Sequence, residues 1–272
     1  MNLRLIATDL DGTVLRSDLT VSERTRQALQ AAEQHGVMVI VATGRPPRWM
    51  RPVADALGHT GLAVCANGAM VYDMHTERIL EHTPITREVV LKVAAAVRAA
   101  VPDVAFAVET YDAGFAREDA YQSRPDISIG WDDVRVGALE DVVGDDVVKL
   151  LVRHAHLDPD GLLAAARQVA GDLAELTHSS RSGLVEISAA GVTKAATLTR
   201  IAGERGIQAE EAVAFGDMPN DLPMLAWAGR GYAMANAHPA VLDAAEHVAP
   251  ANDDDGVAVV VEELLADSHR AG

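Results

Sequence analysis

Two aspartates near the N-terminus, Asp9 and Asp11, stand two residues apart between a short apolar run and Gly12. Paired carboxylates suit an oxygen-liganded divalent cation such as Mg²⁺, or a nucleophile with an acid/base partner. Gly12 permits a sharp turn after them, because glycine adopts backbone conformations that other residues avoid. The same Asp-x-Asp-Gly pattern is also common in structural turns, so its meaning depends on what else the chain brings to it.

Three later segments carry residues of the same chemical kind. Thr43 and Gly44 offer a hydroxyl and a backbone amide to an anion, and Arg45 follows them. Lys194 stands near the start of a predicted helix, where its charge and the helix dipole both favour phosphate. A second acidic group lies further along the chain: Gly216, Asp217, Asn220 and Asp221. Each could be a helix entry, a surface lysine or a helix cap, but all of them fall at predicted carboxyl ends of strands.

The elements that position these groups follow an α/β rhythm. Short apolar runs at residues 3–8, 37–42, 62–66 and 212–215 are typical of buried parallel strands. Predicted helices separate them, and this order implies right-handed crossovers and a parallel sheet. Ligands bind such sheets beyond the carboxyl ends of the strands, where loops from several strands converge. The sequence therefore predicts one site built from all four groups.

A different pattern interrupts this rhythm in the middle of the chain. Residues 70–73 and 78–82 are typical of a hairpin. Beyond it, predicted helices at 86–100 and 158–170 alternate with predicted strands at 104–109, 147–152, 173–177 and 184–188. The α/β rhythm returns after residue 191. We therefore expect a core in two parts, 1–83 and 189–272, with an α+β unit at 84–188 inserted between them.

Composition narrows the class of protein. The 272 residues include 23 basic and 40 acidic ones, and the net charge of −17 disfavours nucleic acid and anionic membrane surfaces as partners. An apolar content of 49% with 23% charged residues is typical of a folded globular protein. The longest apolar stretches, at 37–42 and 257–261, fall far short of the ~20 residues of a membrane span.

Cysteine, histidine and the N-terminal pattern indicate the compartment and the metal chemistry. Cys65 is the single cysteine, so an internal disulfide is excluded, and its apolar surroundings favour a buried small hydrophobe. The first residues show no secretory pattern, so we expect a cytoplasmic protein. Ten histidines show no paired metal-ligand spacing beyond His154 and His156, which we interpret as surface residues.

The four groups resemble, in order, the four motifs of the haloacid dehalogenase superfamily: Asp9-Leu-Asp-Gly-Thr, Thr43-Gly-Arg, Lys194 and Gly216-Asp-x-x-Asn-Asp221. The loop Asn67-Gly68-Ala69 and the position of the insertion are similar to the Cof-type branch, which carries a type-two α/β cap. The resemblance covers the whole chain. It implies an α/β fold with a Rossmann-like parallel-sheet core and an inserted α+β cap domain.

The resemblance also implies a mechanism. Asp9 would attack phosphorus and form an aspartyl-phosphate, while Asp11 would protonate the leaving oxygen and then take a proton from water. The implied Mg²⁺ ligands are the Asp9 carboxylate, the Asp11 backbone carbonyl and Asp217, with Asp221 as a ligand or as support. The implied phosphoryl-binding residues are Thr43, Gly44, Lys194 and Asn220. Arg45 either reaches a substrate anion or faces solvent.

The expected activity is Mg²⁺-dependent hydrolysis of small phosphorylated metabolites. Sugar phosphates are the leading substrate class, and phosphorylated cofactors or precursors such as flavin intermediates come next. One alternative is a sugar phosphomutase that uses the same aspartyl-phosphate. Another is a phospho-accepting signalling protein, since receiver domains combine similar residues on a parallel sheet. No P-loop and no Gly-x-Gly-x-x-Gly dinucleotide motif occurs, and the sequence leaves the oligomeric state open.

Aromatic residues are scarce but gather in the predicted cap. Tyr111, Phe115, Tyr121 and Trp131 lie in one irregular stretch of a chain with 4% aromatics. They either line the substrate entrance or pack the small core of the cap itself.

Overall fold

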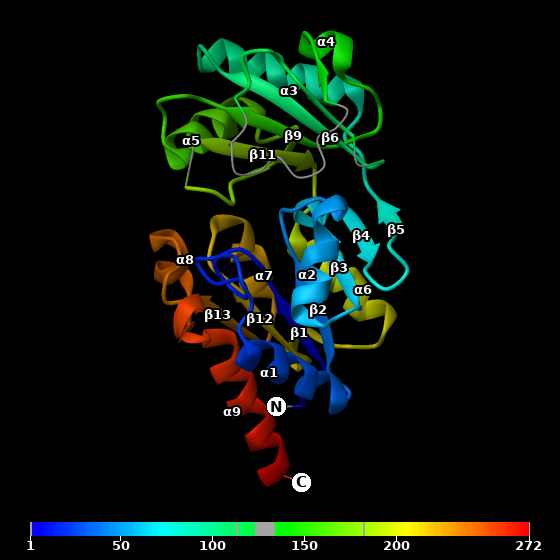
Figure 1. Ribbon diagram of the computed structural model, residues 1–272. Coiled ribbons are helices and arrows are strands. Elements are labelled where there is room, and N and C mark those ends of the chain that lie inside the picture. Colours follow the sequence, from blue (N-terminus) through cyan, green and yellow to red (C-terminus); the bar gives the residue numbers. More distant parts are fainter. Residues whose placement is uncertain (1, 113, 123–133, 182, 272) are drawn as a thin grey trace.

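The computed structural model describes residues 2–112, 114–122, 134–181 and 183–271, with side chains up to residue 267. Trp131 lies outside the described residues. Two sheets are stacked along the long axis of the molecule, as Figure 1 shows, and both chain termini lie at the end of the larger unit that is remote from the smaller one. The fold confirms an α/β protein with a parallel-sheet core.

The larger sheet has eight strands in the order β14-β13-β12-β1-β2-β3-β4-β5. The six from β14 to β3 are parallel, and the β4–β5 hairpin adds two antiparallel strands at one edge. Their bounds, in chain order, are β1 Leu5–Thr8, β2 Met38–Ala42, β3 Leu62–Cys65, β4 Met70–Asp73, β5 Arg78–His82, β12 Ala212–Gly216, β13 Arg230–Met234 and β14 His247–Ala249. Strand β1 lies in the middle, between β12 and β2, so its carboxyl end meets theirs.

Helices cover both faces of this sheet because successive strand residues point to opposite sides. On β1, Ile6 packs under one helical layer, whereas Leu5 and Ala7 pack under the other. The first layer holds α1 (Glu23–Gln34), α2 (Met50–Leu57) and α9 (Gly256–Ala271). The second layer holds α6 (Lys194–Glu204), α7 (Leu222–Trp227) and α8 (Pro239–Ala244). Burial on both faces explains why these strands are continuous apolar runs.

The smaller sheet uses only strands that lie between β5 and α6 in the chain. Its order is β10-β11-β9-β6-β7-β8. The bounds are β6 Ala105–Thr110, β7 Phe115–Arg117, β8 Arg135–Val136, β9 Val147–Arg153, β10 Ala174–Thr177 and β11 Leu184–Ala189. The helices are α3 (Arg87–Ala100), α4 (Leu139–Val142) and α5 (Pro159–Ala170). Helices α3 and α5 cover the face remote from the larger unit, which leaves the other face directed at it (Figure 1).

The sequence analysis did not predict several short helices and strands. Helix α8, strand β14 and strand β8 have six, three and two residues, too few to show a helical or alternating period. The long elements begin and end close to the expected residues, with Ser22 capping α1 and Asp158 capping α5. Within the described ranges, no helix combines the length and the apolar composition that crossing a membrane requires.

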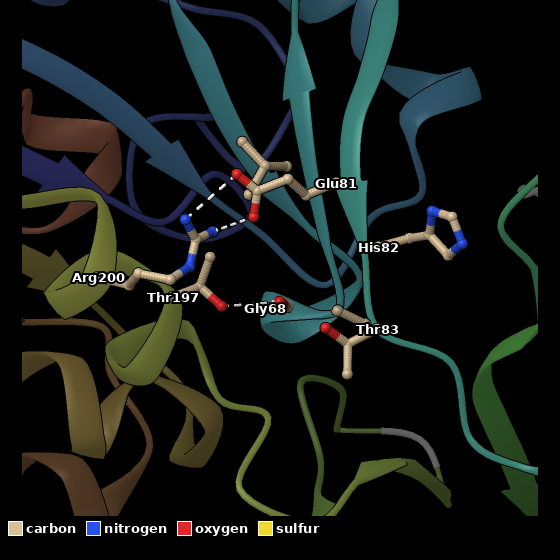
Figure 2. Close-up of a pocket in the computed structure, with 8 residues that line it drawn as sticks. Gly68, Glu81, His82, Thr83, Thr197 and Arg200 are labelled. Carbon is tan, nitrogen blue, oxygen red and sulfur yellow. Dashed lines mark hydrogen bonds and ion pairs between the residues drawn. The ribbon is translucent and has the colours of Figure 1, made fainter. Parts of the chain in front are cut away.

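The loop at Gly68, beside the β4–β5 hairpin, packs against the start of helix α6. Thr197 donates a hydrogen bond to the Gly68 carbonyl at 2.8 Å, and Arg200 pairs with Glu81 across a small recess (Figure 2). None of the predicted site residues lines this recess. Gly68 has a φ of +107°, and a Cβ there would lie 2.3 Å from the Thr193 carbonyl oxygen. This close approach fixes the start of α6, where Lys194 stands.

Replacing Gly68 with Ala is expected to lower the free energy of unfolding by about 2 to 4 kcal/mol, because it combines a disallowed φ with a backbone clash. Thermal or urea unfolding followed by circular dichroism measures the change. Gly203→Ala is the matched control, since Gly203 lies in α6 with nothing within 4 Å of an added Cβ. That variant should gain about 0.5 to 1 kcal/mol from helix propensity. Equal stabilities for the two variants would contradict the packing argument.

Candidate active site

The ends of three neighbouring strands bring the predicted residues together. Asp9 follows β1, Asp217 follows β12 and Thr43 follows β2, while Lys194 is the first residue of α6. Because β12, β1 and β2 are parallel and adjacent, their carboxyl ends meet at one edge of the sheet. The smaller sheet lies over this edge (Figure 1).

Lys194 is the centre of a fully buried ion-pair group. Its Nζ lies 2.6 Å from Asp9 Oδ1 and 2.7 Å from Asp221 Oδ1. The other oxygen of Asp221 accepts hydrogen bonds from the backbone N–H groups of Asp217 and Met218, each at 3.0 Å. Both oxygens of Asp221 are therefore engaged, which suits a residue that positions its neighbours.

Three carboxylates share this small volume. Ligand oxygens of Asp9, Asp217 and Asp221 lie within 4.8 Å of one another, and all three residues are buried. Gly12, with a φ of +76°, packs so closely on Asp217 that an added Cβ would lie 2.3 Å from the carboxylate. The glycine expected to allow a turn thus also makes room for the second acidic group.

Crowding of like charge changes the protonation of these acids. Burial, with smaller contributions from neighbouring carboxylates, raises the pKa of Asp9 to about 7 although Lys194 opposes the shift. Burial and the charges of Asp9 and Asp221 raise the pKa of Asp217 to about 9. One lysine therefore does not balance three buried carboxylates. The all-oxygen donor set and this unbalanced charge fit a hard divalent cation such as Mg²⁺.

Asp11 and Arg45 form a pair beside this group. Arg45 donates from Nε to Asp11 Oδ2 at 2.8 Å and from Nη2 to Asp11 Oδ1 at 2.5 Å. The Asp11 side chain is 46% exposed, and its carboxylate is not among the three that cluster. Arg45 thus contacts a catalytic candidate instead of open solvent. This two-pronged contact fixes the direction in which the Asp11 carboxylate points.

Thr43, Gly44 and Asn220, the residues predicted to bind an anion, lie together with Asn67, which sequence reasoning did not place in the site. The Thr43 hydroxyl accepts from the Arg45 backbone N–H at 3.0 Å. Asn220 Nδ2 donates to Asn67 Oδ1 at 3.0 Å, and a hydrogen bond from the Asn67 side chain helps to lower the pKa of Glu186. Asn67 adopts a φ of +57°, which Asn tolerates better than most residues. The Asn-Gly pair after a strand was the signal that could have assigned it.

The smaller sheet presents charged side chains to this edge. Alternation along β9 and β11 puts Lys149 and Glu186 on the face opposite the one that packs under α3 and α5. Lys149 Nζ lies 2.9 Å from Glu186 Oε1 and donates to the Gly44 carbonyl at 2.6 Å. Ser179 donates to Glu186 Oε2 at 2.5 Å. Sequence reasoning missed these residues because their role depends on how the two units meet.

Near Lys149 and Glu186, an ion pair connects the two units. Arg48, which follows the Thr43 loop, donates a hydrogen bond from each of its two terminal nitrogens to the Glu109 carboxylate on β6, both at 3.2 Å. The Arg48 and Glu109 side chains are 9% and 5% exposed. Together with Lys149 and Glu186, the two units thus meet through four buried charges that balance.

The aromatic residues of the insertion mostly pack among themselves. Phe115 and Tyr121 meet edge to face at 6.3 Å, in a small apolar cluster with residues of β6 and β9. Tyr111 stacks on His82 at 4.1 Å, beside the chain that links the two units. Phe115 and Tyr121 thus pack within the insertion, whereas Tyr111 packs on His82 of β5 in the larger unit.

The chain resembles known proteins along almost its full length. A family model described as haloacid dehalogenase-like hydrolase matches residues 6–261. The 5-amino-6-(5-phospho-D-ribitylamino)uracil phosphatase YitU of Bacillus subtilis is 32% identical over 268 residues, covering 96% of this chain and 97% of the relative. The pyridoxal phosphate phosphatase YbhA of Escherichia coli is 29% identical, covering 95% of this chain and 97% of the relative.

A solved structure of a haloacid dehalogenase-like hydrolase from B. subtilis shares the fold. Its TM-score is 0.80 at 26% identity, and the match covers 96% of this chain and 100% of that chain. The family model spans the residues of all four motif groups and, apart from Leu5, of both sheets. The chain belongs to the haloacid dehalogenase-like hydrolases, and it is a hydrolase.

Proposed function

We propose that this protein is a Mg²⁺-dependent phosphatase of small phosphorylated metabolites, in which residues 84–188 act as a cap on a core formed by 1–83 and 189–272. The observation that carries the proposal is the buried group of Asp9, Asp217, Asp221 and Lys194 at the end of β1. The relatives named for a ribitylamino-uracil phosphate and for pyridoxal phosphate support a phosphorylated cofactor or precursor as substrate. Sugar phosphates remain a class to be tested beside them.

In the proposed reaction, two carboxyl groups act in turn. An oxygen of Asp9 forms a bond to phosphorus while the bond to the leaving oxygen breaks, and Asp11 gives its proton to that oxygen. Water then gives a proton to Asp11 as its oxygen bonds to phosphorus. The bond to Asp9 breaks, inorganic phosphate leaves, and both carboxyl groups return to their starting state. The contact with Arg45 suits the ionised Asp11, and it would orient this carboxylate for the second step, in which it accepts the proton from water.

The remaining residues bind and orient the phosphoryl group. Asp9, Asp217 and the Asp11 carbonyl would hold Mg²⁺, and Asp221 acts by positioning Lys194 and the 217–218 backbone. The ion supplies positive charge against the phosphoryl oxygens when it is bound. Thr43, Gly44 and Asn220 would hold the phosphoryl oxygens through hydrogen bonds.

Mg²⁺ binding is expected to strengthen as the pH rises from 6 to 9. The pKa values of Asp9 and Asp217, raised to about 7 and about 9, mean that the metal must displace protons in this range. The same shifts make the stability of the metal-free protein depend on pH. Because these acids bind protons more tightly in the folded state, the metal-free protein becomes less stable as the pH rises from ~4 towards ~9. The gain in melting temperature on adding Mg²⁺ should therefore grow with pH.

Thermal unfolding with Mg²⁺ and with EDTA, at pH 6, 7, 8 and 9, measures this gain. Calorimetry in buffers of different protonation enthalpy should show protons released on binding. The Asp217→Asn variant lacks one of the two shifted acids and should release fewer. A gain that stays constant across the range, or no proton release, would contradict the assignment of these carboxylates to the metal.

The cap pair Lys149 and Glu186 is expected to recognise the part of the substrate beyond the phosphate. Replacing both with Met and Leu removes a buried ion pair without leaving a lone charge, so the fold should persist. The kcat/KM for polar substrates should fall about tenfold or more, because their hydrogen-bonding groups lose partners. With p-nitrophenyl phosphate, whose body is apolar, the fall should be below about threefold.

Lys92 and Glu88 provide the matched control for this change. They form an exposed pair at 3.8 Å on α3, remote from the core. The Glu88→Leu/Lys92→Met variant should keep the kinetics of the parent protein for every substrate. Equal losses for polar and apolar substrates in the Lys149 and Glu186 variant would show a general disturbance and not recognition.

The proposed function is tested by phosphate release from a panel of compounds. Sugar phosphates, nucleotides, flavin mononucleotide, pyridoxal phosphate and p-nitrophenyl phosphate are each assayed with Mg²⁺ and with EDTA. Release that requires the metal supports the phosphatase, and one compound far above the others identifies the substrate class. Phosphate transfer between sugar positions without free phosphate would instead support a mutase. Stable labelling of the protein without turnover would support a signalling role.

A further inference from the structure

Asp160, His178 and His238 form a second cluster of metal-binding side chains. His178 Nε2 lies 2.9 Å from Asp160 Oδ1, and His238 Nε2 lies 3.2 Å from Asp160 Oδ2. One ligand atom from each residue lies within 4.8 Å of the other two. Two imidazoles and a carboxylate are a donor set that suits Zn²⁺ and related transition metals, whereas Mg²⁺ prefers oxygen ligands.

The fold brings these residues from two units that meet face to face. Asp160 lies in the first turn of α5, and His178 follows the last residue of β10, so both belong to the insertion. His238 precedes α8 in the core. The cluster therefore spans the boundary between the insertion and the core.

We propose that Asp160, His178 and His238 bind a transition-metal ion such as Zn²⁺, which ties the insertion to the core. This binding site is independent of the carboxylate group around Asp9.

The observed distances match what an ion would require. Ligand atoms at 2.0 to 2.2 Å from Zn²⁺ lie roughly 3 Å apart when they subtend 90° to 110°. The two nitrogen–oxygen distances of 2.9 and 3.2 Å are therefore close to those of a filled site. A ring–ring distance of 5.5 Å with an interplanar angle of 75° lets both Nε2 atoms face the carboxylate.

Access and charge also favour an ion here. The His178 side chain is 1% exposed, which fixes one ligand, while the Asp160 side chain is 61% exposed and open to solvent. An ion can enter past Asp160, and water can complete its coordination. The Asp160 carboxylate supplies negative charge beside both imidazoles.

Binding has a cost that limits the affinity. Each imidazole must release the proton that its Nε2 shares with Asp160 and carry a proton on Nδ1. His178 Nδ1 is buried without a partner, and His238 Nδ1 accepts a long contact of 3.3 Å from the Ala240 backbone N–H, which would be lost. We therefore expect a dissociation constant in the micromolar range, not the tighter range of structural zinc sites.

The ion would affect catalysis through the contact between the units, and this consequence rests on the proposed function. The His238 backbone N–H donates to the Asp217 backbone carbonyl at 2.7 Å, so the core ligand is tied to the loop that carries a carboxylate of the catalytic group. A cap held on the core by an ion opens less often, and substrate entry or product release slows. Zn²⁺ should then lower kcat at saturating Mg²⁺.

Cobalt absorbance tests the binding directly. Co²⁺ gives intense visible bands in four-coordinate nitrogen and oxygen sites and weak ones in octahedral oxygen sites. The purified full chain at pH 8, with Mg²⁺ in large excess to occupy the carboxylate group, is titrated with Co²⁺ and then with Zn²⁺. We expect one equivalent of intense absorbance that Zn²⁺ removes.

Two variants and two controls make the result specific. Asp160→Asn and His238→Gln should each weaken binding at least about tenfold, and the exposed Asp160 keeps the test valid if the histidine variant is unstable. His156→Gln, an exposed cap histidine outside the cluster, and Asp217→Asn should both bind as the parent does. Absence of the bands in the parent protein, or their persistence in both cluster variants, would overturn the proposal.

The kinetic consequence is tested separately, by phosphate release with micromolar Zn²⁺ at saturating Mg²⁺. We expect inhibition of the parent protein that His238→Gln removes. Equal inhibition of both would place Zn²⁺ in the carboxylate group and overturn the link between this site and the cap. A chain without phosphatase activity would leave the cobalt result standing, so failure of the proposed function is distinguishable from failure of this site.

Discussion

Asp9→Asn is expected to lower kcat by about four orders of magnitude or more, while the protein stays folded. Amide nitrogen and oxygen cannot form the acyl phosphate on which both chemical steps depend, and nucleophile removal in other enzymes causes collapses of this size. Folding should survive, because the change removes one of three crowded carboxylates and keeps the shape of the side chain. Steady-state phosphate release and circular dichroism measure the two effects.

Asn220→Ala is the comparison that separates the nucleophile from a binding group. It removes one predicted contact to the phosphoryl oxygens. The loss of activity should therefore be a few orders of magnitude smaller than the loss in the Asp9 variant. Substantial Mg²⁺-dependent turnover by Asp9→Asn would show that another residue attacks phosphorus.

Lys194→Met is expected to lower the free energy of unfolding by about 3 to 5 kcal/mol at pH 8 and to abolish activity. The lysine is buried at 0% side-chain exposure and contacts both Asp9 and Asp221, so its loss leaves carboxylates crowded without a cation. The destabilisation should shrink as the pH falls to 5, because these carboxylates then take up protons. Urea unfolding at the two pH values measures it.

Lys92→Met is the control for the loss of a lysine as such. Lys92 is 63% exposed and pairs loosely with Glu88, so its replacement should change stability by less than about 0.5 kcal/mol at either pH. A loss for Lys194→Met that is equally large at pH 5 and pH 8 would indicate lost packing and not unbalanced charge.

Much of the core and its site could be predicted from the sequence because the relevant signals are local. Apolar runs that end in Asp9, Thr43 or Asp217 predict both a buried strand and the polar group at its carboxyl end. Parallel order then places those groups at one edge without any knowledge of side-chain contacts. Lys194 could be added because a helix start and a cation both favour phosphate.

The contacts between the two units could not be predicted in this way. Lys149 lies in an ordinary apolar strand, and only the orientation of the smaller sheet shows that it contacts Gly44. The three residues of the second cluster, Asp160, His178 and His238, lie 18 residues or more apart in the chain. No metal-ligand spacing in the sequence therefore indicates them. The sequence does not decide between substrate contact and solvent exposure for Arg45. Its partner, Asp11, comes near only because two strand ends meet in the fold.

The covalent step at Asp9 is tested most directly by Asp11→Asn with p-nitrophenyl phosphate and Mg²⁺. Nitrophenolate leaves without needing a proton, whereas the attack of water needs Asp11 as a base, so the first step should proceed and the second should stall. The account predicts a burst of one nitrophenolate per protein and a phosphoryl group on Asp9, which borohydride reduction and peptide mass spectrometry locate as homoserine. No burst, or a phosphoryl group on another residue, would contradict it.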